Sequence, residues 1–119
     1  GFTIRRGSSA DTDHILEGQN GSGTTTSIGT GAKLLDSFST SVYRSAKYIA
    51  SSTSATDSQY AEIGLVQNAG ISTVSVYNII NTGSNSVKFY SNTSGSTVYL
   101  LAQATASSNV RIQRTYFIV

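Results

Sequence analysis

The residues capable of acid, base or metal chemistry are few, and most of them gather near the start of the chain. Asp11, Asp13, His14 and Glu17 form the single local acidic cluster, and His14 is the only histidine in the sequence. Oxygen ligands at such spacing can bind a hard cation, but the loop pattern of a calcium-binding hand is missing. We therefore interpret the cluster as a solvated loop and predict no metal site and no cofactor.

Catalytic constellations are equally sparse. Asp36, Asp57 and Glu62 lie far apart, so the spacing does not support the carboxylate pair of a glycosidase. Serine is abundant, yet no serine occupies the Gly-x-Ser-x-Gly pattern of a nucleophile elbow, and a Ser–His–Asp site would depend on His14. Cysteine is absent, which excludes disulfides, thiolate zinc sites and cysteine nucleophiles. We predict that the chain is not an enzyme.

The overall composition indicates a folded domain that neither binds nucleic acid nor spans a membrane. Charged residues make up 12% of the 119 residues, against about 25% in an average globular domain. The net charge is only +2 and the basic residues are scattered, so nucleic-acid binding is not expected. No apolar stretch approaches the roughly 20 residues that span a bilayer. Methionine is absent even at position 1, which fits a processed product, an excised fragment or part of a longer protein.

Two parts of the chain differ in character. Residues 1–33 are polar and rich in Gly, Ser and Thr, so they cannot bury enough apolar area to fold alone. We interpret them as an extended arm with a β-prone start, Phe2–Arg5, that covers a sheet edge or pairs with another subunit. The alternative is a disordered leader or ordinary surface loops.

Residues 34–119 show repeated strand and turn signals. In the stretch 60–67, Ala61, Ile63 and Leu65 alternate with Glu62, Gly64 and Val66, which is typical of a strand with two different faces. Within 71–80, Val74, Val76 and Ile80 are expected to share one face, and residues 51–58 are expected to form a polar turn. Turn signals about every ten residues predict an all-β fold, an antiparallel, jelly-roll-like β-sandwich of about 7–8 strands.

Interface candidates come from exposed aromatic and basic positions. Tyr77 and Tyr99 alternate with core-facing residues, so we predict that they contribute contact area rather than core packing. Arg44 is expected on one face with Ala46 and Tyr48, with Asp36 as its nearest candidate partner; the alternative is that it crosses a subunit interface. In the arm, the interface candidates are Phe2, Ile4 and Arg5.

Several stretches together resemble a known family. Residues 36–48, 61–67 and 109–115, with the opening 2–7, are similar to a β-rich module that recurs in virion structural proteins of tailed bacteriophages, notably cyanophages. The resemblance covers roughly residues 34–119. After Gln67 that module has an aspartate-glycine turn, whereas this chain has Asn68-Ala69-Gly70. The resemblance implies a component of the particle, with no catalytic or cofactor residues to carry over.

The resulting expectation is a non-catalytic virion structural protein that mediates protein–protein assembly on the particle, as a capsid decoration, neck, tail or fibre component. Its expected partners are other virion proteins and further copies of itself. One alternative is a receptor- or carbohydrate-binding domain of a phage fibre that recognises a host-surface glycan. A third is a secreted, adhesin-like β-sandwich of a cell.

Overall fold

All regular secondary structure in the described part of the chain is β-strand. The computed structural model describes residues 2–5, 12–16 and 26–119, with side chains from residue 26 onward. The strands are β1 (Phe2–Arg5), β2 (Thr12–Leu16), β3 (Thr26–Ile28), β4 (Lys33–Ser39), β5 (Tyr43–Ser54), β6 (Ser58–Asn68), β7 (Ile71–Asn81), β8 (Val87–Ser94), β9 (Thr97–Ala104) and β10 (Ser108–Ile118).

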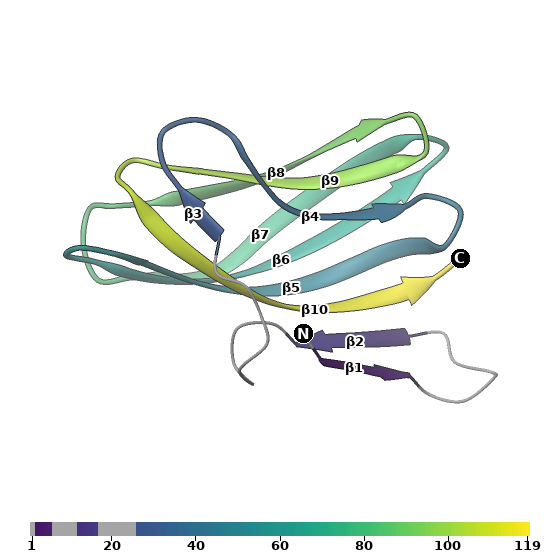
Figure 1. Cartoon of the computed structure of the whole chain (residues 1–119), viewed down its shortest axis with the longest axis horizontal. Helices are drawn as coiled ribbons and strands as arrows, with labels where there is room; N and C mark the ends of the chain where they lie inside the picture. The colour runs from purple at the N-terminus through teal and green to yellow at the C-terminus, as the bar shows by residue number, and fades with distance from the viewer. Residues whose placement is uncertain (1, 6–11, 17–25) are drawn as a thin grey trace.

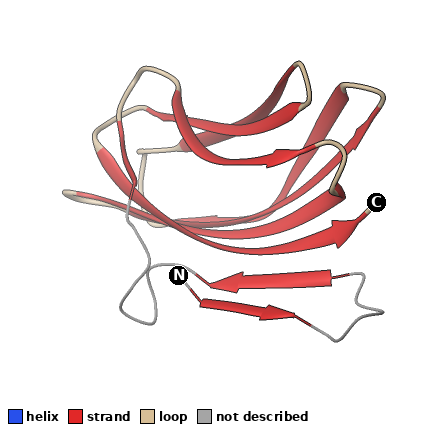
Figure 2. Ribbon diagram, turned by 45° about the vertical axis from the view of Figure 1, so that its right-hand side comes forward, coloured by secondary structure: helices blue, strands red, loops and turns tan. Residues whose placement is uncertain are grey.

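The strands form two antiparallel sheets that face each other (Figures 1 and 2). The large sheet has the order β1-β2-β10-β5-β6-β7, with β3 also paired to β10, and the small sheet has the order β4-β9-β8. Every pairing between strands is antiparallel. The predicted all-β antiparallel sandwich is therefore confirmed.

The hydrophobic core fills the space between the two layers. On β6, the side chains of Ala61, Ile63 and Leu65 are at most 3% exposed, so the predicted alternation is confirmed. On β9, Val98 and Leu100 point inward from the opposite layer and are almost fully buried. The alternating pattern of each strand thus supplies one wall of the core.

The structure corrects the expected turn at residues 51–58. Strand β5 continues through Ser54 and β6 begins at Ser58, so only residues 55–57 form the connection. The polar composition misled the prediction because this stretch is paired on both sides: Thr53 lies opposite Ser58 on β6 and Asn109 on β10. A small hydroxyl residue fits such a central strand, and Ser52 is 1% exposed.

A bulge in β7 corrects a second expectation, that Ile80 shares a face with Val74 and Val76. The register shifts between the pairs formed by Tyr60 and Glu62, so β7 carries one extra residue there. Asn78 lies at this point with a φ of 51°. The extra residue reverses the direction of the side chains that follow, and Ile80 is 66% exposed.

Two of the strands within residues 1–33, β2 and β3, pair with β10. Strand β2 pairs with residues 113–117 of β10 and β3 pairs with residues 108–110, while β1 pairs with β2. Ile28 at the end of β3 is 5% exposed and belongs to the core. This edge of β10 is therefore covered by the chain's own N-terminal strands (Figure 1).

Candidate functional site

The six predicted interface residues do not form one surface. Phe2, Ile4 and Arg5 lie on β1, at the end of the large sheet opposite β7, and their side chains are outside the described part of the chain. Tyr77 lies on β7 opposite Glu62, on the outer face of the large sheet. Tyr99 alternates with buried Val98 and Leu100, so it lies on the outer face of the small sheet.

Arg44 does not pair with Asp36, which corrects the expected contact. Its Nη1 atom donates to Oδ1 of Asn68 at 2.8 Å, in an exposed position where β5 and β6 end side by side. Asp36 is instead paired with Arg114, 78 residues away in sequence. The charge partner of Asp36 could therefore not be predicted from residues nearby in the sequence.

Asp36, Arg114, Tyr48 and Tyr116 form a buried polar cluster between the sheets. The Asp36 carboxylate on β4 accepts hydrogen bonds from the hydroxyls of Tyr48 (2.7 Å) and Tyr116, and Arg114 Nη1 lies 2.5 Å from its Oδ1. Burial raises the pKa of Asp36 above its ordinary value, and Arg114 and the two hydroxyls oppose that rise. The carboxylate is enclosed by these partners, so we assign this cluster to stability rather than to binding.

The outer face of the large sheet contains a shallow hollow of about 400 Å³, called here the Gly64 hollow. Lys47, Gly64 and Ser75 lie in one row across β5, β6 and β7. Because Gly64 has no side chain, the surface of the sheet is depressed at the centre of this row. The walls come chiefly from Ser45, Lys47, Val66, Thr73, Ser75, Tyr77 and Phe117.

Exposed apolar side chains surround this hollow. Val66 is 51% exposed, Phe117 44% and Tyr77 38%, and all three line it. Ile80, on the same face beyond the bulge, is 66% exposed. Single exposed apolar residues are ordinary, but a group of them on one sheet face is characteristic of a contact surface.

A polar network borders Tyr77 on the same face. Glu62 accepts hydrogen bonds from Asn78 Nδ2 (3.0 Å) and the Tyr60 hydroxyl (2.9 Å), and Lys47 Nζ lies 3.3 Å from its Oε1. The bonds from Asn78 and Tyr60 lower the pKa of Glu62, so it is a carboxylate at neutral pH. Asn78, which has a left-handed backbone conformation in the bulge, thus donates its side-chain amide to the Glu62 carboxylate, and this carboxylate lies beside the Tyr77 ring.

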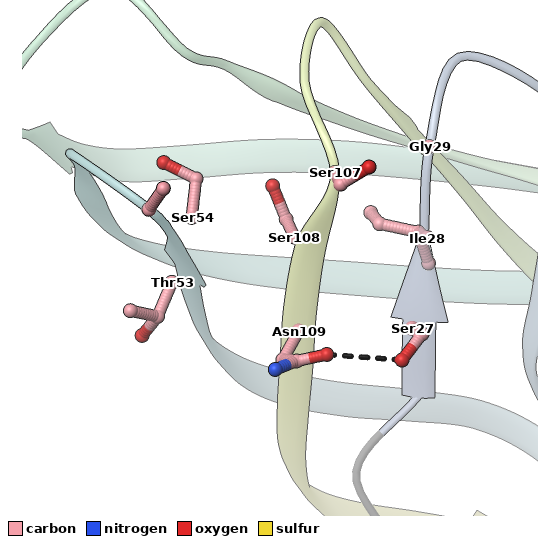
Figure 3. Close-up of a pocket in the computed structure, with 9 residues that line it drawn as sticks. Ser27, Ile28, Gly29, Thr53, Ser54, Ser107, Ser108 and Asn109 are labelled. Carbon is pink, nitrogen blue, oxygen red and sulfur yellow. Dashed lines mark hydrogen bonds between the residues drawn. The ribbon is translucent and has the colours of Figure 1, made fainter.

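A second hollow, of about 650 Å³, lies at one end of the sandwich between β3, the end of β5 and the start of β10. Figure 3 shows it lined by the side chains of Ser27, Thr53, Ser54, Ser107, Ser108 and Asn109. Ser27 Oγ donates to Asn109 Oδ1 at 3.0 Å. These lining groups are hydroxyls and an amide, and the lining contains no acid or base that would activate a serine hydroxyl.

Within the described residues, no group of three or more His, Cys, Asp or Glu side chains is placed to hold a metal ion. The predicted solvated loop is wrong for Asp13 and His14, which lie on strand β2 and pair with both β1 and β10. Asp11, Glu17 and the side chains of the whole cluster lie outside the described part of the chain. The residues that the structure describes contain no helix long and apolar enough to cross a membrane. A third hollow, of about 330 Å³, adjoins the second one and is lined by Ser27, Ser51, Thr53, Asn109 and Arg111.

Sequence reasoning identified Tyr77 but not the Gly64 hollow beside it. The available signal was a glycine in the middle of an alternating strand, which marks a close approach or a gap on a sheet face. Comparisons with protein-family models, curated protein sequences and solved structures found no match to this chain.

Proposed function

We propose that this chain is a non-catalytic structural protein of a tailed-bacteriophage virion, which binds other proteins of the particle through the outer face of its large sheet. The observation that carries the proposal is the group of exposed apolar side chains around the Gly64 hollow: Val66, Tyr77, Ile80 and Phe117. A partner side chain seated in the hollow would remove these groups from water. Burial of apolar surface is the dominant favourable term in most protein association.

Two further observations support this function. The stretches 36–48 and 61–67, which carry part of the resemblance to virion modules, form the second part of β4, the first half of β5 and most of β6 in the sandwich. The described hollows are lined by apolar, hydroxyl and amide groups together with the cations Lys47 and Arg111. Such a lining suits docking better than acid–base chemistry.

The test is incorporation into particles of the phage that encodes the chain, measured by mass spectrometry of purified virions. We expect the wild-type chain in the particle and expect Val66→Lys with Phe117→Lys to reduce incorporation strongly. Ser51→Lys is the matched control because Ser51 is exposed on the same face of β5, away from the Gly64 hollow. Absence of the wild-type chain from particles, or equal incorporation of all variants, would contradict the proposal.

A second candidate function is recognition of a host-surface glycan at Tyr77. It is favoured by an exposed aromatic ring beside the Gly64 hollow, next to the fixed Glu62 carboxylate, the Asn78 amide and Lys47. Sugars bind proteins through aromatic stacking combined with oriented polar groups. A glycan array with Tyr77→Ala tests it, and Tyr99→Ala on the opposite outer face is the control. Binding that Tyr77→Ala abolishes and Tyr99→Ala leaves intact would favour this second function over the first.

A further inference from the structure

The two ends of the large sheet are protected to different degrees. On one side, β10 is covered by β2 and β3, and the sheet ends at β1, which carries Arg5. On the other side, the sheet ends at β7, and no described strand pairs with the outer edge of β7. The sequence of β7, ISTVSVYNIIN, contains no charged residue and no proline.

An edge strand of this kind is unusual, because natural proteins normally blunt long edges with charges, prolines or bulges. β7 has 11 residues and one bulge, which lies near its end at Asn78. Three isoleucines on it are mainly exposed: Ile71 at 72%, Ile79 at 56% and Ile80 at 66%. At the other end, Ser72 donates to Ser91 on β8 at 2.9 Å, so β8 approaches there through side chains.

We propose that the outer edge of β7 pairs with β7 of a second copy of this chain, antiparallel across a two-fold axis. This inference rests on the proposed assembly function and names one of its partners. Because β7 is uncharged, two identical edges can meet without repulsion between like charges. The isoleucine side chains at the edge, Ile79 and Ile80 above all, then become covered by the partner strand.

The closure of the resulting assembly favours β7 of a second copy over β1 of a second copy as the partner of this edge. Pairing β7 with β7 joins two large sheets into one, and both remaining ends are β1 strands that carry Arg5. Pairing β7 with β1 of a neighbour would instead leave a free edge at each step and give an open filament. A two-fold dimer is thus the arrangement that removes the undefended edge.

The area available predicts a weak dimer. A stable, specific interface buries about 800 Å² per partner, and one strand edge with a few exposed isoleucines supplies only part of that. The dimer is therefore expected to dissociate on dilution rather than to be permanent.

Sedimentation analysis of the full chain over a wide range of concentrations tests the proposal. We expect a monomer–dimer equilibrium whose dissociation constant rises at least about tenfold in Ile79→Lys with Ile80→Lys, because a lysine at an edge opposes pairing. Val66→Lys is the matched control, since Val66 is also half exposed but lies on the outer face of β6, one strand inward. Circular dichroism checks that each variant retains its β structure.

Disulfide mapping gives a second measurement that does not depend on destabilising substitutions. The chain has no cysteine, so a single introduced thiol reports one position. With the two-fold axis near the middle of β7, Ser75 lies close to its counterpart in the partner. Ser75→Cys, exposed on β7, is then expected to form a disulfide-linked dimer on mild oxidation, whereas Ser51→Cys on β5 is not.

The outcomes separate this inference from the proposed function. A wild-type chain that is monomeric at all concentrations, or a dimer lost in Val66→Lys but kept in the isoleucine variant, overturns β7 pairing. A dimer that needs residues 1–25 and not Ile79 and Ile80 also overturns it. Presence of the chain in virions would still stand in each case, and a β7 dimer from a chain absent from virions would overturn only the virion role.

Discussion

The half of the large sheet near β10 and the half near β7 contact the small sheet through different chemical groups. On the β10 side, a charged cluster spans the layers, with Asp36 of β4 held by Arg114 and by two tyrosine hydroxyls. On the β7 side, the contact between the sheets is made by the neutral amide of Gln59. Gln59 of β6 accepts from the Val87 backbone N–H at 2.9 Å and donates to the Val87 carbonyl at 3.2 Å.

The difference follows from which hydrogen-bond donors and acceptors need partners on each side. Where β4, β5 and β10 approach, several side-chain donors converge on one acceptor, which a carboxylate with several lone pairs can serve. Where the chain crosses from β7 to β8, the sheet ladder stops and backbone groups lose their partners. An amide offers both a donor and an acceptor, so Gln59 replaces a strand partner for Val87 without burying a charge.

The largest expected effect comes from removing the cation of the β10 side. Arg114→Met leaves Asp36 as a buried carboxylate without its counter-charge, so we expect a loss of about 3–5 kcal/mol in the free energy of unfolding. Arg44→Met is the matched control: Arg44 is exposed and bonds only to Asn68 in the described structure, so the expected change is within about 0.5 kcal/mol. Urea unfolding measures both, and equal losses would show that the cluster is not special.

Features of the fold that depend on neighbouring residues were predicted correctly from the sequence, and features that depend on residues far apart in the chain were not. The alternation of Ala61, Ile63 and Leu65 is local, and it predicted the core face of β6 correctly. The bulge at Asn78 depends on how β7 meets β6, so no pattern within β7 placed Ile80 on the outer face.

The candidate site shows the same limit. Tyr77 was predicted as exposed from alternation alone, but its neighbours Lys47 and Gly64 are set by the register of three strands. Arg114 could not be assigned to Asp36 because the two residues are 78 positions apart in the sequence and lie on different sheets. Register and sheet packing are properties of the whole chain, which a window of ten residues does not contain.

Alkaline pH is the next test of the β10 side. Burial raises the pKa of Tyr48 and of Tyr116 above the ordinary value of 10.0. The unfolded chain releases these protons near pH 10 while the folded chain retains them, so their contribution to stability is complete below pH 10 and is lost as pH rises further. The expected slope is about 1.4 kcal/mol per pH unit for each tyrosine.

Substitution separates this effect from general alkaline unfolding. Tyr48→Phe is expected to be less stable at neutral pH, because a hydrogen bond to Asp36 is gone, yet to show a shallower dependence on pH above 10. Tyr116→Phe should behave in the same way and the double variant should show the smallest slope. Urea unfolding at several pH values measures the slopes, and identical slopes in all variants would assign the alkaline effect elsewhere.

The amide of Asn85, in the connection between β7 and β8, binds the start of β10 and the β9–β10 connection, and its loss is expected to cost less stability than the loss of Arg114. Its Nδ2 donates to Ser108 Oγ at 2.9 Å, and its Oδ1 accepts from Thr105 Oγ1 and from the Ala106 backbone N–H. Asn85→Ala removes these partners from a buried site, for an expected loss of about 1–3 kcal/mol. Asn92→Ala is the control, since Asn92 is exposed and its Oδ1 accepts from the adjacent Thr93 N–H; comparable losses would contradict the role assigned to Asn85.

The smallest expected effect concerns the hairpin that starts β7. Ala69 has a φ of 52°, a left-handed conformation that favours glycine, whereas the β8–β9 hairpin already has Gly95 at 59°. Ala69→Gly relieves steric strain and loses some chain entropy, so a net gain of about 0.5–1 kcal/mol is expected. Gly95→Ala imposes the same strain on the other hairpin, where nothing lies within 4 Å of the new Cβ, and should lose a similar amount. Opposite signs in thermal unfolding would trace both changes to backbone conformation, because a packing effect would not reverse between two open turns.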